Sequence, residues 1–168
     1  TMRLAGRWSK ERAERHDVTI TRNIPYREGG GWDHQLDIYQ PAGDGPHPVA
    51  LYIHGGGYIH ELAYAHWLII TQLVKHTNAA VTVPLYALAP EHDHTKATPM
   101  MDALYDRIAA GRERKKTFVA GDSAGGNLSA VVAQAAREGR LHERFVHRPV
   151  LRVSFDRGRR VRYGMFFG

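Results

Sequence analysis

The 168-residue sequence contains no cysteine. This absence excludes disulfide bonds, thiolate metal sites and cysteine nucleophiles from the chemistry of the chain. Long apolar runs are also missing, because no stretch approaches the roughly 20 residues of a transmembrane helix. We therefore expect no membrane span. Residues 1–15 are charged and lack the apolar stretch of a secretory signal, so the expected compartment is the cytoplasm.

Lysine is absent from the end of the chain. Residues 140–168 contain eight arginines, no lysine and two acidic residues, whereas residues 1–139 are balanced at 15 basic and 15 acidic residues. The net charge of +6 therefore comes entirely from this arginine-rich tail. Its arginines are scattered, whereas a basic groove needs them gathered on one face. We expect no nucleic-acid partner.

Short apolar runs without alternation are typical of strands buried on both faces. Three such runs alternate with helical patterns, which predicts a mainly parallel sheet with helices on both faces. The predicted core strands are 49–53, 79–84 and 117–120, and the predicted helices are 65–77, 99–112 and 124–138. A hairpin near a sheet edge is predicted at 18–26 and 34–40, and one more strand at 150–155. The chain divides into an N-terminal arm or helix (1–17), a core (18–139) and an atypical tail (140–168).

A G-x-S-x-G pattern stands at residues 121–125, where Gly121 and Gly125 flank Ser123. A predicted strand ends just before the pattern and a predicted helix begins just after it, as a nucleophile elbow requires. In such a sharp turn the serine backbone is strained, and side chains at the two glycine positions would collide with neighbouring elements. The pattern predicts an exposed Ser123 hydroxyl at the carboxyl edge of the sheet, above the positive end of the helix.

A second motif, His54-Gly55-Gly56-Gly57, follows the predicted strand at 49–53. Consecutive glycines allow N–H groups to converge on a developing negative oxygen with no side chain in the way. A plain glycine-rich turn is the alternative interpretation. A phosphate loop is excluded, because neither of the phosphate-binding glycine patterns is present. The two motifs together favour an oxyanion loop paired with the serine.

With these motifs in this order, the sequence resembles the hormone-sensitive-lipase-like carboxylesterases of the α/β-hydrolase fold. The resemblance spans roughly 18–139, and four stretches carry it: 36–39, 54–58, 86–92 and 121–127. It implies an α/β-hydrolase sheet and hydrolysis of small short-chain or aryl carboxylic esters through an acyl-enzyme at Ser123. It implies no cofactor and no metal.

The resemblance also implies roles for the loop residues. The oxyanion donors carried over from the family are the N–H groups of Gly55, Gly56 and Ala124. His54 and Gly57 support the loop, and His54 is not the general base. One departure lies in the third stretch, where Ala87 stands at a position that is commonly arginine in the family.

A larger departure is the missing acid and base, which follow the serine in that family. The candidates after Ser123 are His142, His147 and Asp156, and each is more simply a surface residue of the tail. The triad acid and base are therefore unknown and apparently absent. The arginine-rich tail resembles an out-of-frame read of a GC-rich gene. We therefore expect the chain to be a truncated or frameshifted esterase, with an α/β-hydrolase fold that lacks its C-terminal part.

Three other features allow either a purely structural or a functional interpretation. His92-Asp93-His94 suggests a metal pair, but its loop fits the non-metal family pattern, so we expect no metal site. The sequon at residues 127–129 falls inside a predicted helix, which makes glycosylation implausible. Tyr58 and Trp67 either line a substrate pocket or pack in the core.

The expected function is a serine esterase that is weak or inactive as this chain, because a serine hydroxyl is a poor nucleophile without a base. One alternative is a relative that binds a small ligand without turnover, as the plant gibberellin receptor does. Another is a frameshifted pseudo-enzyme without a stable fold. The sequence does not predict an oligomeric state.

Overall fold

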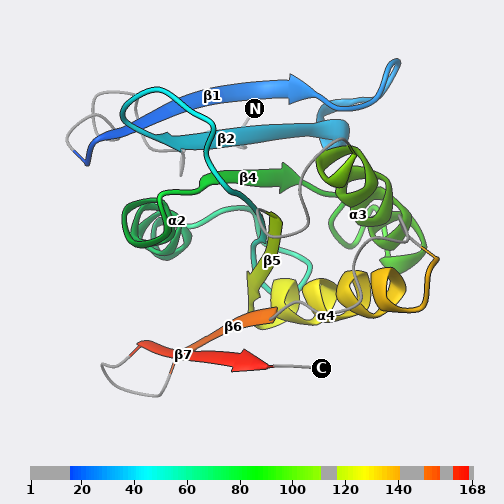
Figure 1. Cartoon of the computed structure of the whole chain (residues 1–168). Helices are drawn as coiled ribbons and strands as arrows, with labels where there is room; N and C mark the ends of the chain where they lie inside the picture. Colours follow the sequence, from blue (N-terminus) through cyan, green and yellow to red (C-terminus); the bar gives the residue numbers. More distant parts are fainter. Residues whose placement is uncertain (1–15, 111–116, 141–149, 156–160, 167–168) are drawn as a thin grey trace.

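The computed structural model describes residues 16–110 and 117–140, and the backbone of 150–155 and 161–166. In these residues one mixed sheet has the strand order β1-β2-β4-β3-β5-β6-β7 (Figure 1). Its central strands run parallel: β3 (Val49–Ile53), β4 (Ala80–Leu85), β5 (Thr117–Asp122) and β6 (Val150–Phe155). The flanking strands are antiparallel to their neighbours: β1 (Val18–Pro25), β2 (Gln35–Pro41) and β7 (Val161–Phe166).

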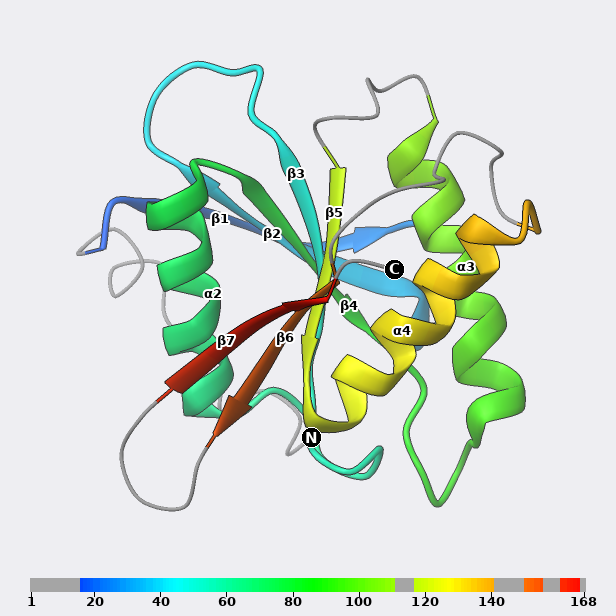
Figure 2. The same cartoon turned by 60° about the horizontal axis from the view of Figure 1, so that its bottom comes forward.

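Helices cover both faces of this sheet, as predicted. Figure 2 shows α2 (Tyr64–Thr77) on one side, and α3 (His94–Ala109) and α4 (Ser123–Arg137) on the other. A 3-10 turn at Trp32–His34 leads into β2.

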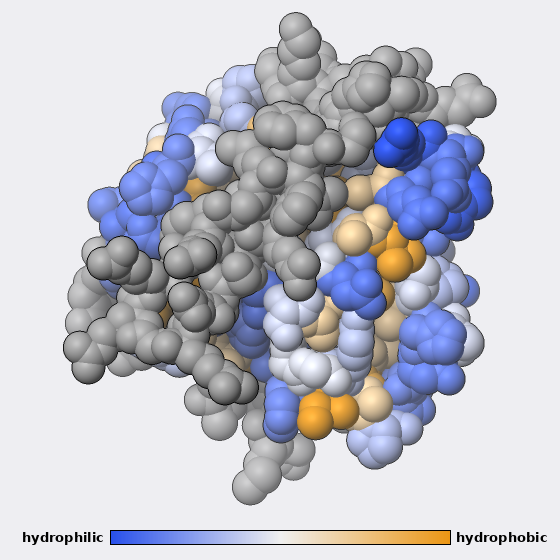
Figure 3. All heavy atoms as spheres, turned by 90° about the horizontal axis from the view of Figure 1, so that it is seen from below, coloured by the Kyte–Doolittle hydropathy of each residue, from blue (hydrophilic) through white to orange (hydrophobic). Residues whose placement is uncertain are grey.

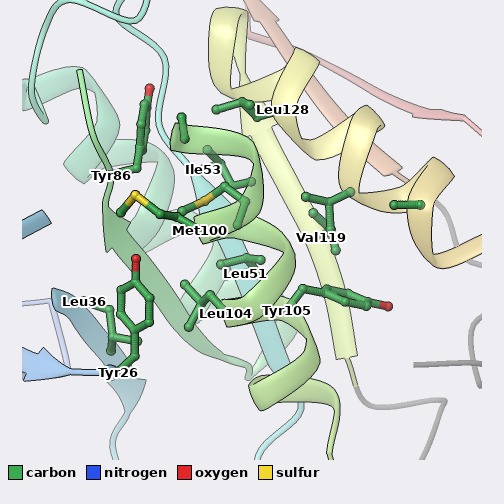
Figure 4. Close-up of a cluster of buried hydrophobic side chains, with 14 of the residues drawn as sticks. Tyr26, Leu36, Leu51, Ile53, Tyr86, Met100, Leu104, Tyr105, Val119 and Leu128 are labelled. Carbon is green, nitrogen blue, oxygen red and sulfur yellow. The ribbon is translucent and has the colours of Figure 1, made fainter. Parts of the chain in front are cut away.

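The sheet separates two hydrophobic cores, and strand β3 contributes side chains to both. Its side chains alternate, so that Leu51 and Ile53 join the cluster beneath α3 and α4, whereas Ala50 and Tyr52 join the cluster beneath α2. Figure 4 shows the first cluster, with Leu104 of α3 and Leu128 of α4 close to the sheet. All five residues of β3 are buried, which explains the unbroken apolar run in the sequence.

The outer strand β1 is irregular. Its register against β2 shifts between Thr21 and Ile24, and Asn23 lies in the left-handed region with φ 55°. The Asn23 N–H donates to the Asp37 carboxylate, at 3.1 Å, from within this bulge. The predicted edge hairpin is therefore confirmed, with a bulge that the sequence pattern did not indicate.

Two predicted boundaries need correction, and one strand was not predicted. Helix α3 begins at His94 rather than at Pro99, because Asp93 caps it by accepting the Thr95 N–H at 2.9 Å. Strand β5 runs on to Asp122, beyond the predicted end at 120. Strand β7, which pairs with the confirmed strand β6, was not predicted within the arginine-rich tail. The expected arm or helix at 1–15 lies outside the described residues.

The surface of the described part is mixed in character. Seen from below, small hydrophobic patches lie between hydrophilic ones (Figure 3). The large apolar side chains exposed in this part are Trp32, Ile59, Tyr64 and Leu68. Among the helices that the structure describes, each is too short or too polar to cross a bilayer.

Candidate active site

Ser123 stands where β5 ends and α4 begins, at the carboxyl edge of the parallel strands. Its φ is +48°, in the left-handed region that L-residues with side chains rarely adopt. Its side chain is exposed, although the residues on either side of the turn are largely buried. The sequence context thus produces the strained strand-to-helix turn that the G-x-S-x-G pattern predicts.

The two glycines of the elbow are required by close backbone contacts. A Cβ on Gly125 would overlap the Ile53 carbonyl oxygen and would lie 2.5 Å from the His54 carbonyl oxygen. A Cβ on Gly121 would lie 2.6 Å from the Ser129 hydroxyl oxygen and would overlap the Gly125 carbonyl. Helix α4 therefore sits directly on the end of β3, beside the start of the glycine loop.

The glycine loop makes a tight turn after β3. Gly56 and Gly57 have φ values of +107° and +63°, which glycine adopts without strain. The Gly56 carbonyl accepts the N–H groups of Ile59 and His60, at 3.2 and 3.0 Å. Gly56 is half-buried and Gly57 is exposed. Within the described residues no hydrogen bond occupies the N–H of either glycine.

Gly55 differs from the two glycines that follow it. It is buried, and its N–H donates to Oδ1 of Asp122 at 2.9 Å. A Cβ at this position would overlap the Asp122 carboxylate. The Gly55 N–H already has a buried anionic acceptor, which argues against the predicted role of Gly55 as an oxyanion donor.

Asp122 is the residue that the sequence analysis did not single out. Only 4% of its surface is exposed, and Oδ1 also accepts the Tyr52 hydroxyl at 2.6 Å. On the other side, His66 Nε2 lies 3.4 Å from Oδ2. Burial acts to raise the pKa of Asp122, but hydrogen bonds from His66 and Tyr52 outweigh it and hold the pKa below its usual value. The carboxylate is therefore ionised at neutral pH.

The tautomer of His66 follows from its two contacts. Its Nδ1 accepts the Ala63 N–H at 2.7 Å, at the start of α2, so the ring proton of the neutral imidazole is on Nε2. Nε2 is therefore the donor that faces Asp122. Strand β3, helix α2 and the glycine loop all meet at this carboxylate, one residue before Ser123.

His54 faces the interior and acts on the loop. Its Nδ1 donates to the Gly55 carbonyl at 2.8 Å, and its own carbonyl accepts the Tyr86 hydroxyl at 2.8 Å. The Tyr86 ring packs against the imidazole at a centroid distance of 4.5 Å. Burial lowers the pKa of His54 to about 4, so this side chain is neutral at pH 7. Both contacts are those of a residue that shapes the loop.

The loop is also tied to α4 on its exposed side. The Asn127 amide donates to the Tyr58 hydroxyl at 2.9 Å, and the Tyr58 carbonyl accepts the Ala89 N–H at 2.8 Å. Trp67, by contrast, is 1% exposed, and its ring lies 5.2 Å from that of Tyr39. Of the two alternatives for these aromatic residues, the core position holds for Trp67, whereas Tyr58 lies beside the nucleophile helix.

The described part of the chain places no general base in hydrogen-bond contact with the serine. His142, His147 and Asp156 lie outside the described residues. Within the described part, no histidine forms a hydrogen bond with the Ser123 hydroxyl. Of the possible metal pair, Asp93 serves as the cap of α3, and no group of three or more potential ligands gathers in the described residues.

Comparison with known proteins identifies relatives in sequence and in fold. The family model for the α/β-hydrolase fold matches residues 50–161, which reaches past Arg140 and so further than the resemblance seen in the sequence. The carboxylic ester hydrolase LipN of Mycobacterium tuberculosis is 33% identical over 120 residues, covering 62% of this chain and 30% of LipN. Esterase LipI of the same organism is 38% identical over 96 residues, covering 54% of this chain and 30% of LipI.

A solved structure is similar as well. The hyperthermophilic esterase of Pyrobaculum calidifontis is 32% identical, with a TM-score of 0.60, over 73% of this chain and 41% of that one. The chain thus spans about 30% of the length of the curated relatives named above. The family match covers more than half of the chain and includes both the glycine loop and the elbow. The protein belongs to the α/β-hydrolase family, and the three relatives described above are named as ester hydrolases.

Proposed function

We propose that this chain carries the nucleophile and the oxyanion donors of a serine carboxylesterase that hydrolyses small short-chain or aryl esters. One observation carries the proposal: an exposed serine in a strained strand-to-helix turn, beside a glycine loop in which two N–H groups have no acceptor among the described residues. The esterase names of LipN and LipI support the reaction class. The Ser123 hydroxyl oxygen attacks the ester carbonyl carbon, the alcohol leaves, and water hydrolyses the acyl-enzyme.

The oxyanion donors can be inferred from the hydrogen bonds that the carbonyl groups of the loop accept. In a trans peptide the C=O and N–H point in opposite directions. His54 holds the Gly55 carbonyl, so the N–H of Gly56 points to the opposite side. Ile59 and His60 hold the Gly56 carbonyl, so the N–H of Gly57 is likewise the free end.

The third donor belongs to the helix. Ala124 is the second residue of α4, where backbone N–H groups have no intrahelical partner. We therefore assign the oxyanion to the N–H groups of Gly56, Gly57 and Ala124. Relative to the expectation from the sequence, Gly57 replaces Gly55. Removal of one such donor typically lowers the rate by roughly 100- to 1000-fold.

A fluorophosphonate probe tests the proposal, because it reacts with activated serines. We expect a covalent adduct at Ser123, located by peptide mass spectrometry, and its loss in Ser123→Ala. The control is Ser129→Ala, which removes a buried hydroxyl of the same helix that bonds the Gly125 carbonyl. Failure of the folded wild-type chain to react would contradict an activated nucleophile.

The second candidate function is ligand binding without turnover. It is favoured by the described residues, in which no histidine contacts the Ser123 hydroxyl. It predicts that a small ester binds to the wild-type chain and is recovered intact, with no labelling of Ser123. Hydrolysis that disappears in Ser123→Ala would eliminate this alternative.

A further inference from the structure

The Asp122 carboxylate and the Tyr86 hydroxyl hold opposite ends of one peptide unit. That unit joins His54 to Gly55: its N–H donates to Asp122 at 2.9 Å, and its C=O accepts from Tyr86 at 2.8 Å. Asp122 and Tyr86 come from β5 and from the segment after β4, so two separate parts of the fold orient this peptide. It is the first peptide of the glycine loop.

A peptide held at both ends sets the direction of the chain that follows. The next unit, from Gly55 to Gly56, leaves this clamp with its carbonyl bonded to the His54 ring. The Gly56 and Gly57 N–H groups are then the first donors of the loop without an acceptor in the part of the chain that the structure describes. Their positions depend on the Gly55 peptide on one side and on the bonds of the Gly56 carbonyl to Ile59 and His60 on the other, because Gly56 and Gly57 have no side chains of their own.

We propose that Asp122 is a positioning residue for ester hydrolysis: its Oδ1 holds the Gly55 N–H and thereby aims the Gly56 and Gly57 N–H groups at the oxyanion. The proposal rests on the function proposed above and deepens it. Asp122 does not touch the substrate. Tyr52 and His66 keep the carboxylate in place from two further elements, β3 and α2.

Two substitutions at this position separate the acceptor from the charge. Asp122→Ala removes the acceptor and leaves the Gly55 N–H, the Tyr52 hydroxyl and His66 without it. Asp122→Asn keeps an oxygen for Gly55 and Tyr52 and places an NH2 group toward His66 Nε2, which is itself a donor. If the hold on Gly55 is what matters, the alanine variant is much slower and the asparagine variant is close to wild type.

Asp37 provides a matched control. It is also a buried aspartate, on the flanking strand β2, and it accepts a backbone N–H from Asn23 and the Tyr39 hydroxyl. The donors of these two hydrogen bonds lie on β1 and β2, not on the glycine loop. Asp37→Ala therefore lowers stability in a similar way without changing the direction of the oxyanion donors.

The first measurement is the kinetics of phosphonate labelling, separated into the probe affinity and the rate of the covalent step. For Asp122→Ala we expect a roughly 10- to 100-fold slower covalent step, since displaced donors stabilise the oxyanion less. Probe affinity should change little, and Asp122→Asn and Asp37→Ala should stay within roughly 3-fold of wild type. A covalent step at the wild-type rate in Asp122→Ala, or an equal loss in Asp122→Asn, overturns the proposal.

The second measurement needs no reaction and no variant. In the wild-type chain, amide hydrogen exchange should be much slower at Gly55 than at Gly57, because the Gly55 N–H is buried and bonded. Equal exchange rates at the two glycines overturn the proposal even if Asp122→Ala does not fold. A wild-type chain that shows slow exchange at Gly55 but no labelling contradicts the proposed function and leaves the hold on Gly55 supported.

Discussion

Gly125→Ala sets two physical effects against each other at the third residue of α4. In a helix, alanine is more favourable than glycine by about 1 kcal/mol, so propensity alone predicts a more stable protein. The structure predicts the opposite, because the added Cβ would overlap the Ile53 carbonyl oxygen and lie 2.6 Å from the His54 carbonyl carbon. Contacts under about 3 Å force something to move.

The atoms that must move belong to the backbone, and this determines the size of the free-energy cost. Overpacking a well-packed interior typically costs about 1 to 3 kcal/mol, and flexible side chains reduce the cost by rotating away. Here the end of β3 and the start of α4 have to separate, so we expect a cost of about 3 kcal/mol. After the propensity gain of about 1 kcal/mol, the net loss of unfolding free energy is about 2 kcal/mol.

Urea unfolding followed by tryptophan fluorescence measures this difference as a lower midpoint at unchanged slope. Ala130→Gly is the control, because Ala130 is an exposed residue of the same helix and its substitution reports propensity alone, a loss of about 1 kcal/mol. The covalent labelling of Ser123 should also slow down in Gly125→Ala, since the His54 carbonyl begins the glycine loop. A Gly125→Ala midpoint at or above that of wild type would refute the steric reasoning.

Two further outcomes follow from strain and from burial. Ser123→Gly should raise the unfolding free energy by about 1 kcal/mol, because glycine adopts the φ of +48° without strain, and it should abolish labelling. Ser123→Ala is the control, because alanine keeps the strain and should not gain stability. Equal urea midpoints for the two variants would contradict this reasoning. Burial lowers the pKa of His54 to about 4. Below about pH 6.5 the unfolded chain therefore binds a proton at His54 that the folded chain does not bind. The free energy of unfolding consequently falls as the pH falls toward 4. In urea titrations from about pH 7 to pH 5, His54→Asn, which keeps a donor for the Gly55 carbonyl, should show a flatter decline than wild type; identical slopes would contradict a neutral His54.

The parts of the fold that the sequence predicts are those where burial imposes a pattern. Residues 49–53 are apolar throughout because β3 is covered on both faces, and β4 is likewise largely buried, and apolar apart from Thr82. The elbow was predictable because its two glycines face backbone atoms of neighbouring elements, which leaves no room for a side chain at either position.

The start of α3 was missed because two local signals compete. Proline favours the first turn of a helix, and the sequence analysis therefore placed the helix start at Pro99. The Asp93 side chain caps the helix one and a half turns earlier, and Pro99 is accommodated inside it. Strand β7 was not predicted because the sequence analysis treated residues 156–168 only as part of an arginine-rich tail, although Val161–Phe166 contains a single arginine.

The role of Asp122 was beyond any local pattern. Its partners Gly55 and Tyr52 lie 67 and 70 residues away in the chain, and only the parallel pairing of β3 with β5 brings them together. The available signal was an aspartate inside the elbow next to strands expected to be fully buried. A carboxylate in such a place needs donors, and the first N–H of the glycine loop is one of them.

The bulge in β1 has a consequence for how copies of the protein meet one another. An outer strand with a continuous row of free N–H and C=O groups is a template for pairing with a second chain. At Asn23 that row is interrupted, because the backbone turns into the left-handed region and the N–H is directed to Asp37. A strand added along β1 therefore cannot pair over its full length, so this edge of the sheet is protected against aggregation by its own backbone geometry.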